Sequence, residues 1–374
     1  MTQNAVANDG LFHFADDLGP IKILHIHDPA TGLKAVVAID NVACGPAIGG
    51  VRMAVDVSAE EAFRLARAMT FKNAAAGLPH GGGKSVIFAD PKMPLAEKER
   101  IVRSFARAIR DLVEYIPGPD MGTDERCMAW VKDEIGRASG LPPEIGGIPL
   151  DEIGATGLGV SVAVEVAARL CNLALAGARV AVQGYGSVGR HAARFLAAKG
   201  TILIAAADSA STIYDPKGLD LDKLDAIKAA GQTLDRYPGG QKLGRDAVIG
   251  LECDIWIPAA RPDVITAKNV DELKARLIAQ GANIPITGEA EKLLHEKGVL
   301  SIPDFIANAG GVICAATEFH GGTKTSAFAA IDEKIRANTQ AVLTEAKSQG
   351  LLPRTAAVNL AERRVRAAMA LRRR

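Results

Sequence analysis

The fold follows from one stretch, Arg179-Val-Ala-Val-Gln-Gly184-Tyr185-Gly186-Ser187-Val188-Gly189-Arg-His-Ala-Ala-Arg-Phe-Leu196. It joins an apolar strand, three glycines with the spacing G-x-G-x-x-G and a segment with helical periodicity, in the order that a dinucleotide-binding turn requires. The first two glycines allow a tight turn close to a pyrophosphate, the third packs helix on strand, and the helix N-terminus attracts phosphate. We therefore predict a nucleotide cofactor bound by residues 184–189.

The next predicted strand covers residues 202–207 and ends in Asp208. Asp208 follows Gly184 by 24 positions, close to the spacing at which a carboxylate binds the adenosine ribose hydroxyls and repels a 2′-phosphate. Residues 209–214 contain no arginine that could offset this repulsion. We therefore expect NAD rather than NADP.

Further strand-like runs alternate with helical segments, which predicts a doubly wound parallel sheet, a Rossmann domain. They cover residues 253–257, 277–279 and 299–302. Such sheets bind ligands at the carboxyl ends of their strands. The residues that we expect at these ends, or at the start of the helix opening this domain, are Ala259, Ala260, Asn283, Asn308 and Thr156.

With 374 residues, of which 48% are hydrophobic, the chain is long enough for about two domains. Glycine and proline gather around residues 135–155, which is typical of a crossing between domains. We expect an α/β fold with an N-terminal domain over 1–150, a Rossmann domain over 151–330, and an active-site cleft between them.

Composition favours small-molecule partners over nucleic acid or a membrane surface, because 44 basic and 43 acidic residues leave a formal net charge of +1. The five cysteines form no C-x-x-C pair, so neither a disulfide framework nor a metal site is indicated. Asp9, Asp16 and Asp17 interrupt the N-terminal segment, so we predict no signal peptide, no membrane span and a cytoplasmic protein.

Two lysines stand out in Met69-Thr-Phe-Lys72-Asn-Ala-Ala-Ala-Gly-Leu-Pro-His-Gly81-Gly-Gly-Lys84-Ser-Val-Ile87. Lys72 ends an amphipathic helical pattern. Lys84 follows three glycines, which we interpret as a loop that a ligand can approach closely. Two lysines lying along the surface are the alternative interpretation. Farther on, residues 115–123 form a second predicted loop, where Asp120 lies among two prolines and two glycines and is by default a turn former.

These segments resemble the amino acid dehydrogenase family that includes glutamate, leucine, phenylalanine and valine dehydrogenases. The resemblance covers roughly residues 21–320 and includes Cys44-Gly-Pro-Ala-Ile48-Gly-Gly50-Val-Arg-Met53, which in the family places backbone near the bound amino acid. It implies that two helices over about 330–374 pack back on the first domain and that the chain forms homo-oligomers.

The family carries out reversible oxidative deamination of an L-amino acid to a 2-oxo acid and ammonia. The resemblance implies that Lys72 pairs with the substrate α-carboxylate, that Lys84 is the general base, and that Asp120 shuttles a proton to and from the substrate nitrogen. Lys84 must then lose its proton more easily than a free lysine, through burial and a neighbouring cation. A Schiff-base lysine is the rival role for Lys84.

The expected substrate is hydrophobic, of the Phe, Leu or Val type. Glutamate dehydrogenases carry a lysine just before the Gly-Gly pair and a serine on the helix after Asn-Ala-Gly-Gly, where this chain has Ile48 and Ala315. Burying an unpaired γ-carboxylate would cost several kcal/mol. By resemblance, the residues at the substrate besides Lys72 are Ile48, Gly50, Gly118, Asn283, Val312 and Ala315.

Three alternatives stay open at this point. Within the same class, the chain could be a glutamate dehydrogenase. A non-catalytic NAD-binding sensor would need Gly184, Gly186 and Gly189 but neither Lys84 nor Asp120. A structural or interaction protein has the weakest support, because the sequence has neither a repeat nor a charged face.

Overall fold

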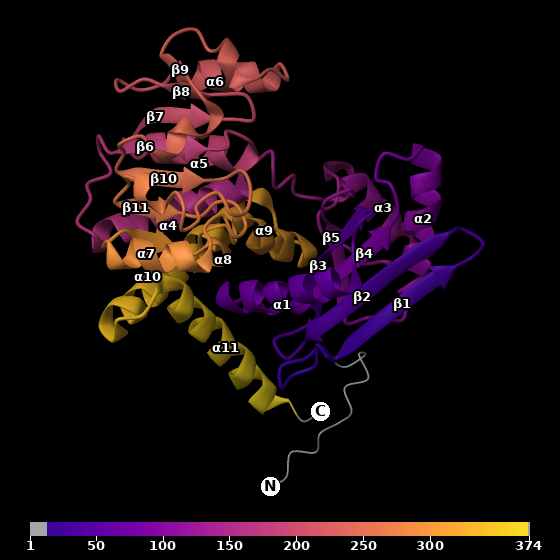
Figure 1. The fold of residues 1–374 in the computed structure, drawn as a ribbon. Helices are drawn as coiled ribbons and strands as arrows, with labels where there is room; N and C mark the ends of the chain where they lie inside the picture. Colours follow the sequence, from indigo (N-terminus) through magenta and orange to yellow (C-terminus); the bar gives the residue numbers. More distant parts are fainter. Residues whose placement is uncertain (1–12, 373–374) are drawn as a thin grey trace. The chain divides into compact units, whose positions relative to one another are not determined.

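The computed structural model describes residues 13–372, and the chain forms two compact units within them (Figure 1). Unit 1 takes in the described parts of Met1–Pro149, Glu318–Gly321 and Ala361–Arg374, and unit 2 takes in Leu150–Thr317 and Gly322–Leu360. Most of the N-terminal segment on which the signal-peptide prediction depends, Asp9 included, lies outside the described residues.

Unit 1 is built on a five-stranded sheet with the order β1-β2-β4-β3-β5. β1 and β2 form the antiparallel hairpin at one edge, β2 is also antiparallel to β4, and β3 is parallel to both β4 and β5. The strands of unit 1 are β1 Lys22–Asp28, β2 Leu33–Asn41, β3 Ala47–Ala54, β4 Gly81–Phe88 and β5 Tyr115–Pro119.

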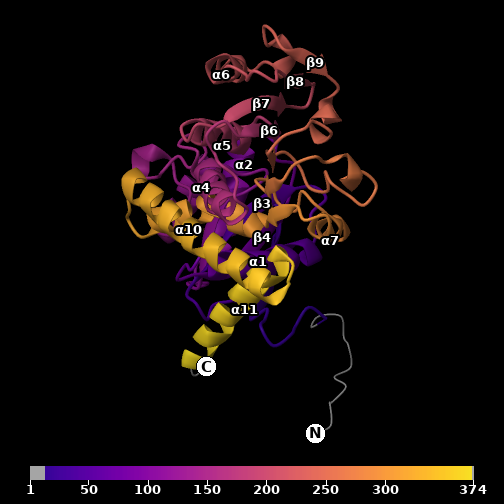
Figure 2. The same cartoon turned by 90° about the vertical axis from the view of Figure 1, so that its left-hand side faces the viewer.

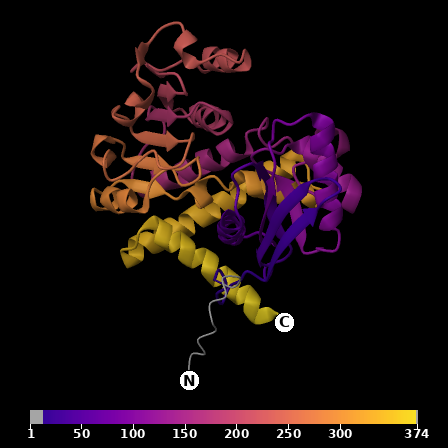
Figure 3. The same ribbon diagram turned by 45° about the vertical axis from the view of Figure 1, so that its right-hand side comes forward.

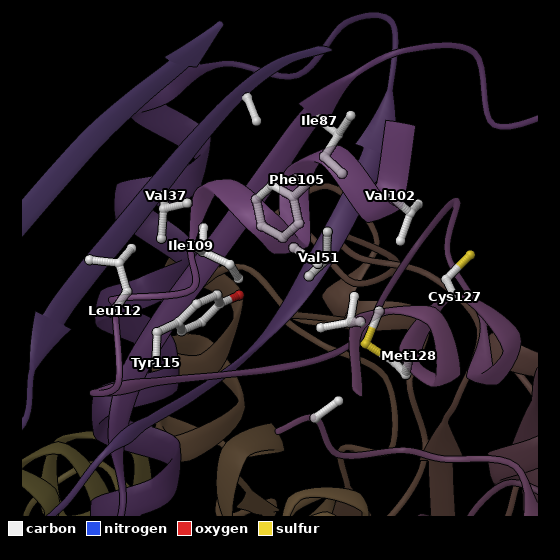
Figure 4. Packing of buried hydrophobic residues seen from close by; sticks show 14 of the residues in the cluster. Val37, Val51, Ile87, Val102, Phe105, Ile109, Leu112, Tyr115, Cys127 and Met128 are labelled. Carbon is white, nitrogen blue, oxygen red and sulfur yellow. The ribbon is translucent and has the colours of Figure 1, made fainter. Parts of the chain in front are cut away.

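Helices cover both faces of this sheet (Figure 3). One face packs on α2 (Leu95–Ala108) and α3 (Glu125–Ile135) through the core cluster in Figure 4, where Phe105 and Met128 meet Val51 and Ile87 of the strands. The other face packs on α1 (Ala59–Ala75) through small side chains such as Ala62 and Ala66. Because strand side chains alternate between faces, residues two apart on a strand share a helix partner.

Two segments that we predicted as loops are strands. The glycine run Gly81–Gly83 begins β4, and residues 115–119 form β5. The glycines serve close packing, since a Cβ at Gly82 would lie 2.1 Å from the backbone nitrogen of Thr70 on α1. Proline is tolerated in β5 because this strand lies at the sheet edge, where a missing N–H breaks no ladder on the open side.

Unit 2 contains a seven-stranded sheet with the order β12-β11-β10-β6-β7-β8-β9. The strands from β12 to β7 are parallel, whereas the short β8 and β9 are antiparallel and extend one edge. The strands are β6 Arg179–Gln183, β7 Ile202–Ala207, β8 Thr212–Tyr214, β9 Gln241–Leu243, β10 Ile255–Pro258, β11 Leu277–Ala279 and β12 Leu300–Ile302. The predicted Rossmann sheet is thus confirmed, and β8 and β9 are additions to it.

The remaining helices complete the two units. The α-helices are α4 Ala155–Leu170, α5 Ser187–Ala197, α6 Leu221–Ala229, α7 Gly288–Glu296, α8 Asp304–Ala307, α9 Gly310–Phe319, α10 Lys324–Gln349 and α11 Pro353–Leu371. The 3-10 helices are η1 Pro143–Ile145, η2 Leu234–Arg236, η3 Arg245–Ile249 and η4 Val270–Glu272.

The closing helices are divided between the units, whereas we expected both to pack on the first domain. α10 belongs to unit 2, where it runs beside α4 (Figure 2). Only the end of α11, from Ala361, belongs to unit 1. In the part of the chain that the structure describes, none of the helices has the length and apolar character needed to cross a membrane.

Candidate functional site

Unit 1 aligns three of the predicted site residues across its three parallel strands. The pairs Ile48↔Gly82 and Val51↔Ser85 place Gly50 on β3 level with Lys84 on β4, and Gly50 pairs directly with Gly118 on β5. All three lie on the α1 face, because Val86, two positions after Lys84, packs there against Ala62 and Ala66. Lys84 and the two glycines therefore form one row.

The missing side chain at Gly50 lets Asp120 reach Lys84 across β3. Asp120 follows β5, and its Oδ2 contacts Lys84 Nζ as an ion pair. A Cβ built on Gly50 would lie 2.7 Å from both the Cβ and the Oδ2 of Asp120. Any other residue at position 50 would thus collide with the carboxylate, so glycine is a requirement of the Lys84–Asp120 contact.

Asp120 is held by a second cation on the opposite side. Its Oδ1 accepts hydrogen bonds from Arg52 Nε at 3.3 Å, from Arg52 Nη2 at 3.2 Å and from the backbone N–H of Met121 at 2.6 Å. The Arg52 guanidinium uses its remaining terminal nitrogen, Nη1, to contact Glu61 in the first turn of α1. The carboxylate therefore presents one fixed oxygen to Arg52 and the other to Lys84.

Lys84 is buried, with 7% of its side chain exposed. Burial, the largest cause, and the positive charge of Arg52 lower the pKa of Lys84 to about 7, Glu61 raises it, and Lys72 lowers it further. A buried lysine with neighbouring cations holds its proton less strongly, since both effects disfavour the ammonium. The environment thus lets this lysine exchange a proton near neutral pH.

Lys72 lies in the last turn of α1, and several contacts join this end of the helix to β4, β2 and α11. Asn73 Nδ2 donates to the carbonyl of Gly81 at 2.7 Å, and Thr70 Oγ1 donates to Asp40 at 2.6 Å. From α11, Arg364 donates to the carbonyls of Ala74 and Ala75 at 3.0 and 2.6 Å. The two bonds from Arg364 satisfy carbonyls at the C-terminal end of α1.

The predicted pocket residues are distributed over both units. Ile48 is buried on β3, two positions before Gly50 and on the same face. The direction that a side chain would take at Gly118 is filled by Ser139, whose Oγ would lie 3.0 Å from an added Cβ. The space left by this glycine is therefore occupied by Ser139. Val312 and Ala315 lie on α9 in unit 2 and are partly buried.

In unit 2, the glycine turn between β6 and α5 has the geometry that a pyrophosphate requires. Gly184 has φ +97°, and a Cβ there would lie 2.6 Å from the Cβ of Ala260. A Cβ at Gly189 would lie 2.1 Å from the carbonyl oxygen of Gly184, so this glycine brings helix and strand together. Space above Gly186 is open, and no side chain caps α5. Its first N–H groups can therefore bind an anion.

The strand ends of unit 2 bring the other predicted cofactor residues together. The N–H of Ala259 donates to the carbonyl of Gln183 at 2.7 Å, next to Ala260 and the turn. Asn308 Nδ2 donates to Asn283 Oδ1 at 3.0 Å, while the buried Asn308 Oδ1 has no partner among the described residues. Such an orphaned acceptor suits the amide N–H2 of a nicotinamide.

Four further predicted cofactor residues, Thr156, Tyr185, Ser187 and Val188, each have specific neighbours within unit 2. Thr156 near the start of α4 lies beside α9, because a Cβ at Gly311 would be 3.0 Å from its Oγ1. The Tyr185 side chain is buried and donates to Asp225 at 3.1 Å, and the backbone N–H of Tyr185 donates to the carbonyl of Ala207 at 2.8 Å. Ser187 donates to the carbonyl of Asp151 at 3.1 Å, and Val188 lies near Gly281.

Asp208 follows β7 as predicted, but internal hydrogen bonds surround its carboxylate. Oδ1 accepts from the N–H groups of Ala210 and Ser211 at 2.9 and 3.3 Å, and Oδ2 accepts from that of Leu234 at 2.8 Å and from Lys228 Nζ at 3.2 Å. Burial raises the pKa of Asp208, but these bonds outweigh it, and the net shift is downward. Asp208 is thus a fixed anion with a cation beside it.

Sequence reasoning missed three charged residues. The two-residue period of a strand could have indicated Arg52, because it lies two positions after Gly50 and so faces the same side of β3. Glu61 precedes Lys72 by about three helical turns and shares its helix face. Lys228 on α6 had no sequence signal, because it reaches Asp208 only through the folding of the segment after β7. Among the described residues no cluster could hold a metal ion.

Comparisons with known proteins identify the family of this chain. The family model for the Glu/Leu/Phe/Val dehydrogenase dimerisation domain matches residues 20–137, and the model for Glutamate/Leucine/Phenylalanine/Valine dehydrogenase matches residues 146–373. The chain belongs to this family. It is an amino acid dehydrogenase, an oxidoreductase that acts on amino acids with a nicotinamide cofactor.

Similar amino acid dehydrogenases include two glutamate dehydrogenases. A glutamate dehydrogenase of Aeropyrum pernix is 41% identical over 355 residues, which cover 89% of this chain and 85% of that protein. An NADP-specific glutamate dehydrogenase of Saccharolobus shibatae is 36% identical over 293 residues, 75% of this chain and 69% of that protein. Both are named for glutamate, and one is named for NADP.

Solved structures add a relative with another substrate. The hetero-hexameric glutamate dehydrogenase of Thermus thermophilus, in a Leu-bound form, has a TM-score of 0.84 at 30% identity, over 95% of this chain and 90% of that one. The L-tryptophan dehydrogenase of Nostoc punctiforme has a TM-score of 0.75 at 27% identity, over 94% of this chain and 97% of that one. The fold thus occurs with both charged and hydrophobic substrates.

Proposed function

We propose that the chain catalyses the reversible, NAD-dependent oxidative deamination of a hydrophobic L-amino acid of the Phe, Leu or Val type. The single observation that carries this proposal is the row on unit 1, where the buried Lys84 pairs with the partly buried Asp120 and Ile48 lies on the same sheet face. The pair supplies acid–base chemistry. Ile48 supplies an apolar surface in place of a cation.

The residues of unit 1 take the following roles. The Lys72 ammonium pairs with the α-carboxylate, which orients the substrate Cα. Lys84, with its pKa lowered to about 7, accepts a proton from the water that attacks the iminium carbon. Asp120 moves a proton to and from the substrate nitrogen. In the reverse direction the same groups add ammonia to a 2-oxo acid.

Unit 2 holds the cofactor in this proposal, over a Rossmann domain that we place at about residues 151–330. The turn at Gly184, Gly186 and Gly189 and the open N-terminus of α5 suit the pyrophosphate. Asn283 and Asn308 suit the nicotinamide amide. When bound, the nicotinamide accepts the hydride from the substrate Cα.

NAD is the proposed cofactor because Asp208 remains an anion where the adenosine ribose would bind. Lys228 partly offsets that charge. We therefore propose a preference for NAD that is moderate, with NADP accepted less well. Lys228 is the residue that sets how strong this preference is.

Glutamate is the second candidate substrate, and the names of the similar proteins favour it. A glutamate γ-carboxylate needs a cation once it is buried. On the α1 face, Arg52 already contacts Asp120 and Glu61, and position 48 holds isoleucine. These observations favour a hydrophobic side chain over a charged one.

The test is the rate of NADH formation with a panel of L-amino acids at alkaline pH, for the wild type and for Lys84→Ala. We expect turnover with Phe, Leu or Val, little with Glu, and loss in the variant. Turnover with Glu alone would replace the hydrophobic assignment by the glutamate one. NAD binding without turnover of any amino acid would instead support a non-catalytic sensor.

We also propose that the chain forms homo-oligomers. Two findings support this proposal: the family model that matches residues 20–137 describes a dimerisation domain, and one similar solved structure is a hexamer. Light scattering of the purified protein measures the assembly directly. A monomer at micromolar concentration would overturn this part of the proposal.

A further inference from the structure

Arg52 occupies a central place among the charged groups of unit 1. Its guanidinium donates to Asp120 Oδ1 through Nε and Nη2, at 3.3 and 3.2 Å, and contacts Glu61 through Nη1. Only 20% of the Arg52 side chain is exposed. A planar guanidinium is suited to such a double contact, because its donors lie in one rigid plane.

We propose that Arg52 and Glu61 form a positioning pair for the catalytic residues: Arg52 fixes one oxygen of Asp120 so that the other faces Lys84, and Glu61 fixes Arg52. This inference rests on the proposed function and adds to it a residue pair that sets both geometry and charge at the base. Neither residue touches substrate in this proposal, and each acts through Asp120 and Lys84.

The geometry supports the role of Glu61 as the anchor. Arg52 lies on β3, and Glu61 lies in the first turn of α1, where Ser58 caps the helix by accepting from the N–H of Glu61. The carboxylate is thus held on a rigid element close to the strand. Because Arg52 has Asp120 on one side and Glu61 on the other, its orientation is determined by two partners.

The charged groups around Lys84 come from every neighbouring element. β3 contributes Arg52, the end of β5 contributes Asp120, and α1 contributes Glu61 and Lys72. On β2, the buried Asp40 is already paired with Arg67 and bonded to Thr70. Arg52 and Lys72 lower the pKa of Lys84, whereas Glu61 raises it.

We therefore expect the removal of each charge to shift the pKa of Lys84 in opposite directions. Removing the positive charge in Arg52→Met raises the pKa of Lys84 and moves the acid limb of kcat/KM to higher pH. Removing the negative charge in Glu61→Gln lowers that pKa and moves the limb to lower pH. Each shift is expected to be about one pH unit or less, as for the removal of a single charge near a partly solvated site.

Arg52→Lys separates charge from geometry. A lysine keeps the positive charge but cannot hold Asp120 and Glu61 with one planar fork. We expect its acid limb to stay close to that of the wild type while kcat falls at least tenfold. If Arg52 had a merely structural role, its substitution would lower the amount of folded protein without separating the position of the acid limb from the loss of kcat.

The experiment measures kcat/KM against pH for the wild type, Arg52→Met, Arg52→Lys and Glu61→Gln. Glu60→Gln is the control, since Glu60 is exposed, lies next to Glu61 in the same helical turn and contacts none of these groups. We expect no shift in the control. Shifts of the same sign in Arg52→Met and Glu61→Gln, or no shift in either, would overturn the proposal.

A second readout does not require turnover. The Lys84 ammonium is titrated by NMR in protein labelled with ¹³C at the lysine ε-carbon, with Lys84→Ala to assign the signal. Opposite shifts in an enzyme that turns over amino acids support the pair. Opposite shifts without turnover leave the pair standing and refute the proposed function. If Arg52→Met does not fold, as judged by circular dichroism, Glu61→Gln and Arg52→Lys still decide the outcome.

Discussion

Asp120 in unit 1 and Asp208 in unit 2 both follow the carboxyl end of a parallel strand, and both contact a lysine. Their other partners differ in kind. Asp120 is held by the Arg52 side chain and by one backbone N–H, whereas Asp208 accepts from three backbone N–H groups. A carboxylate held largely by side-chain charges responds when a substrate changes those charges, and one surrounded by main-chain donors does not.

This difference separates a proton-transferring site from a recognition site. The lysine beside Asp120 is 7% exposed, and its pKa is lowered to about 7, so this lysine can exchange a proton near neutral pH. Lys228 beside Asp208 is 26% exposed along its side chain. Unit 2 therefore offers a permanent anion with a compensating cation, which suits selection between cofactors rather than chemistry.

The largest expected effect tests this contrast directly with Asp120→Asn and Asp208→Asn. Loss of a proton-transferring carboxylate lowers kcat by about 10²- to 10⁴-fold, so we expect Asp120→Asn to fall in this range. Asp208→Asn should change kcat by less than about tenfold, because it alters binding of the distant end of the cofactor. Steady-state kinetics with saturating NAD measures both. Equal losses of kcat would contradict the distinction.

Gly50→Ala should have the next largest effect. The added Cβ would lie 2.7 Å from Asp120 Oδ2, which displaces the carboxylate from Lys84. A misplacement of about 1 Å costs roughly 10²-fold in rate, and we expect a loss of that order in kcat with little change in the melting temperature. Gly244→Ala is the control, because nothing lies within 4 Å of a Cβ there. An active Gly50→Ala enzyme would refute the requirement for glycine.

A smaller effect concerns stability and its pH dependence. The pKa of Lys84 in the folded chain is about 7, below the ordinary value of 10.5, so between these values the unfolded chain binds a proton that the folded chain lacks. The unfolding free energy contributed by this group therefore rises with pH over that window, by at most about 1.4 kcal/mol per pH unit. Below pH 7 both the folded and the unfolded chain hold this proton, so the pH dependence from Lys84 is absent there.

Urea unfolding of the wild type and Lys84→Met at pH 7, 8 and 9 measures this contribution. We expect the stability of the wild type to rise with pH relative to the variant, because methionine removes the titrating group. Tyr214→Phe in unit 2 serves as a variant that leaves the charges near Lys84 unchanged. A constant difference between wild type and Lys84→Met across the three pH values would contradict the lowered pKa.

The smallest expected effect concerns Lys228→Met. Removing this cation leaves the charge of Asp208 without its compensating ammonium, so kcat/KM with NADP should fall about tenfold more than with NAD, or ~1.4 kcal/mol. Lys223→Met on the same helix is the control, since Lys223 contacts Asp220 instead. An unchanged ratio of the two cofactors would show that Lys228 has no part in the selection.

The sequence alone was sufficient for the elements whose signals are local. The strand, glycine turn and helix at residues 179–196 are confirmed as β6, the turn and α5, because each glycine has a conformational task that only glycine performs. The roles of Lys84, Asp120 and Lys72 come from family resemblance and stay predictions.

Only the tertiary structure decided which charges face one another. Arg52, Gly50 and Lys84 meet because β3 and β4 are paired in one particular register, and Glu61 joins them because α1 packs closely over Gly82. Lys228 reaches Asp208 only after the chain has passed through β8 and α6. These contacts join residues distant in sequence, and no periodicity or motif encodes a strand register or the path of a loop. The residues proposed to carry the chemistry are thus recognised from short sequence motifs. The charged residues that surround them are brought together only by the tertiary structure.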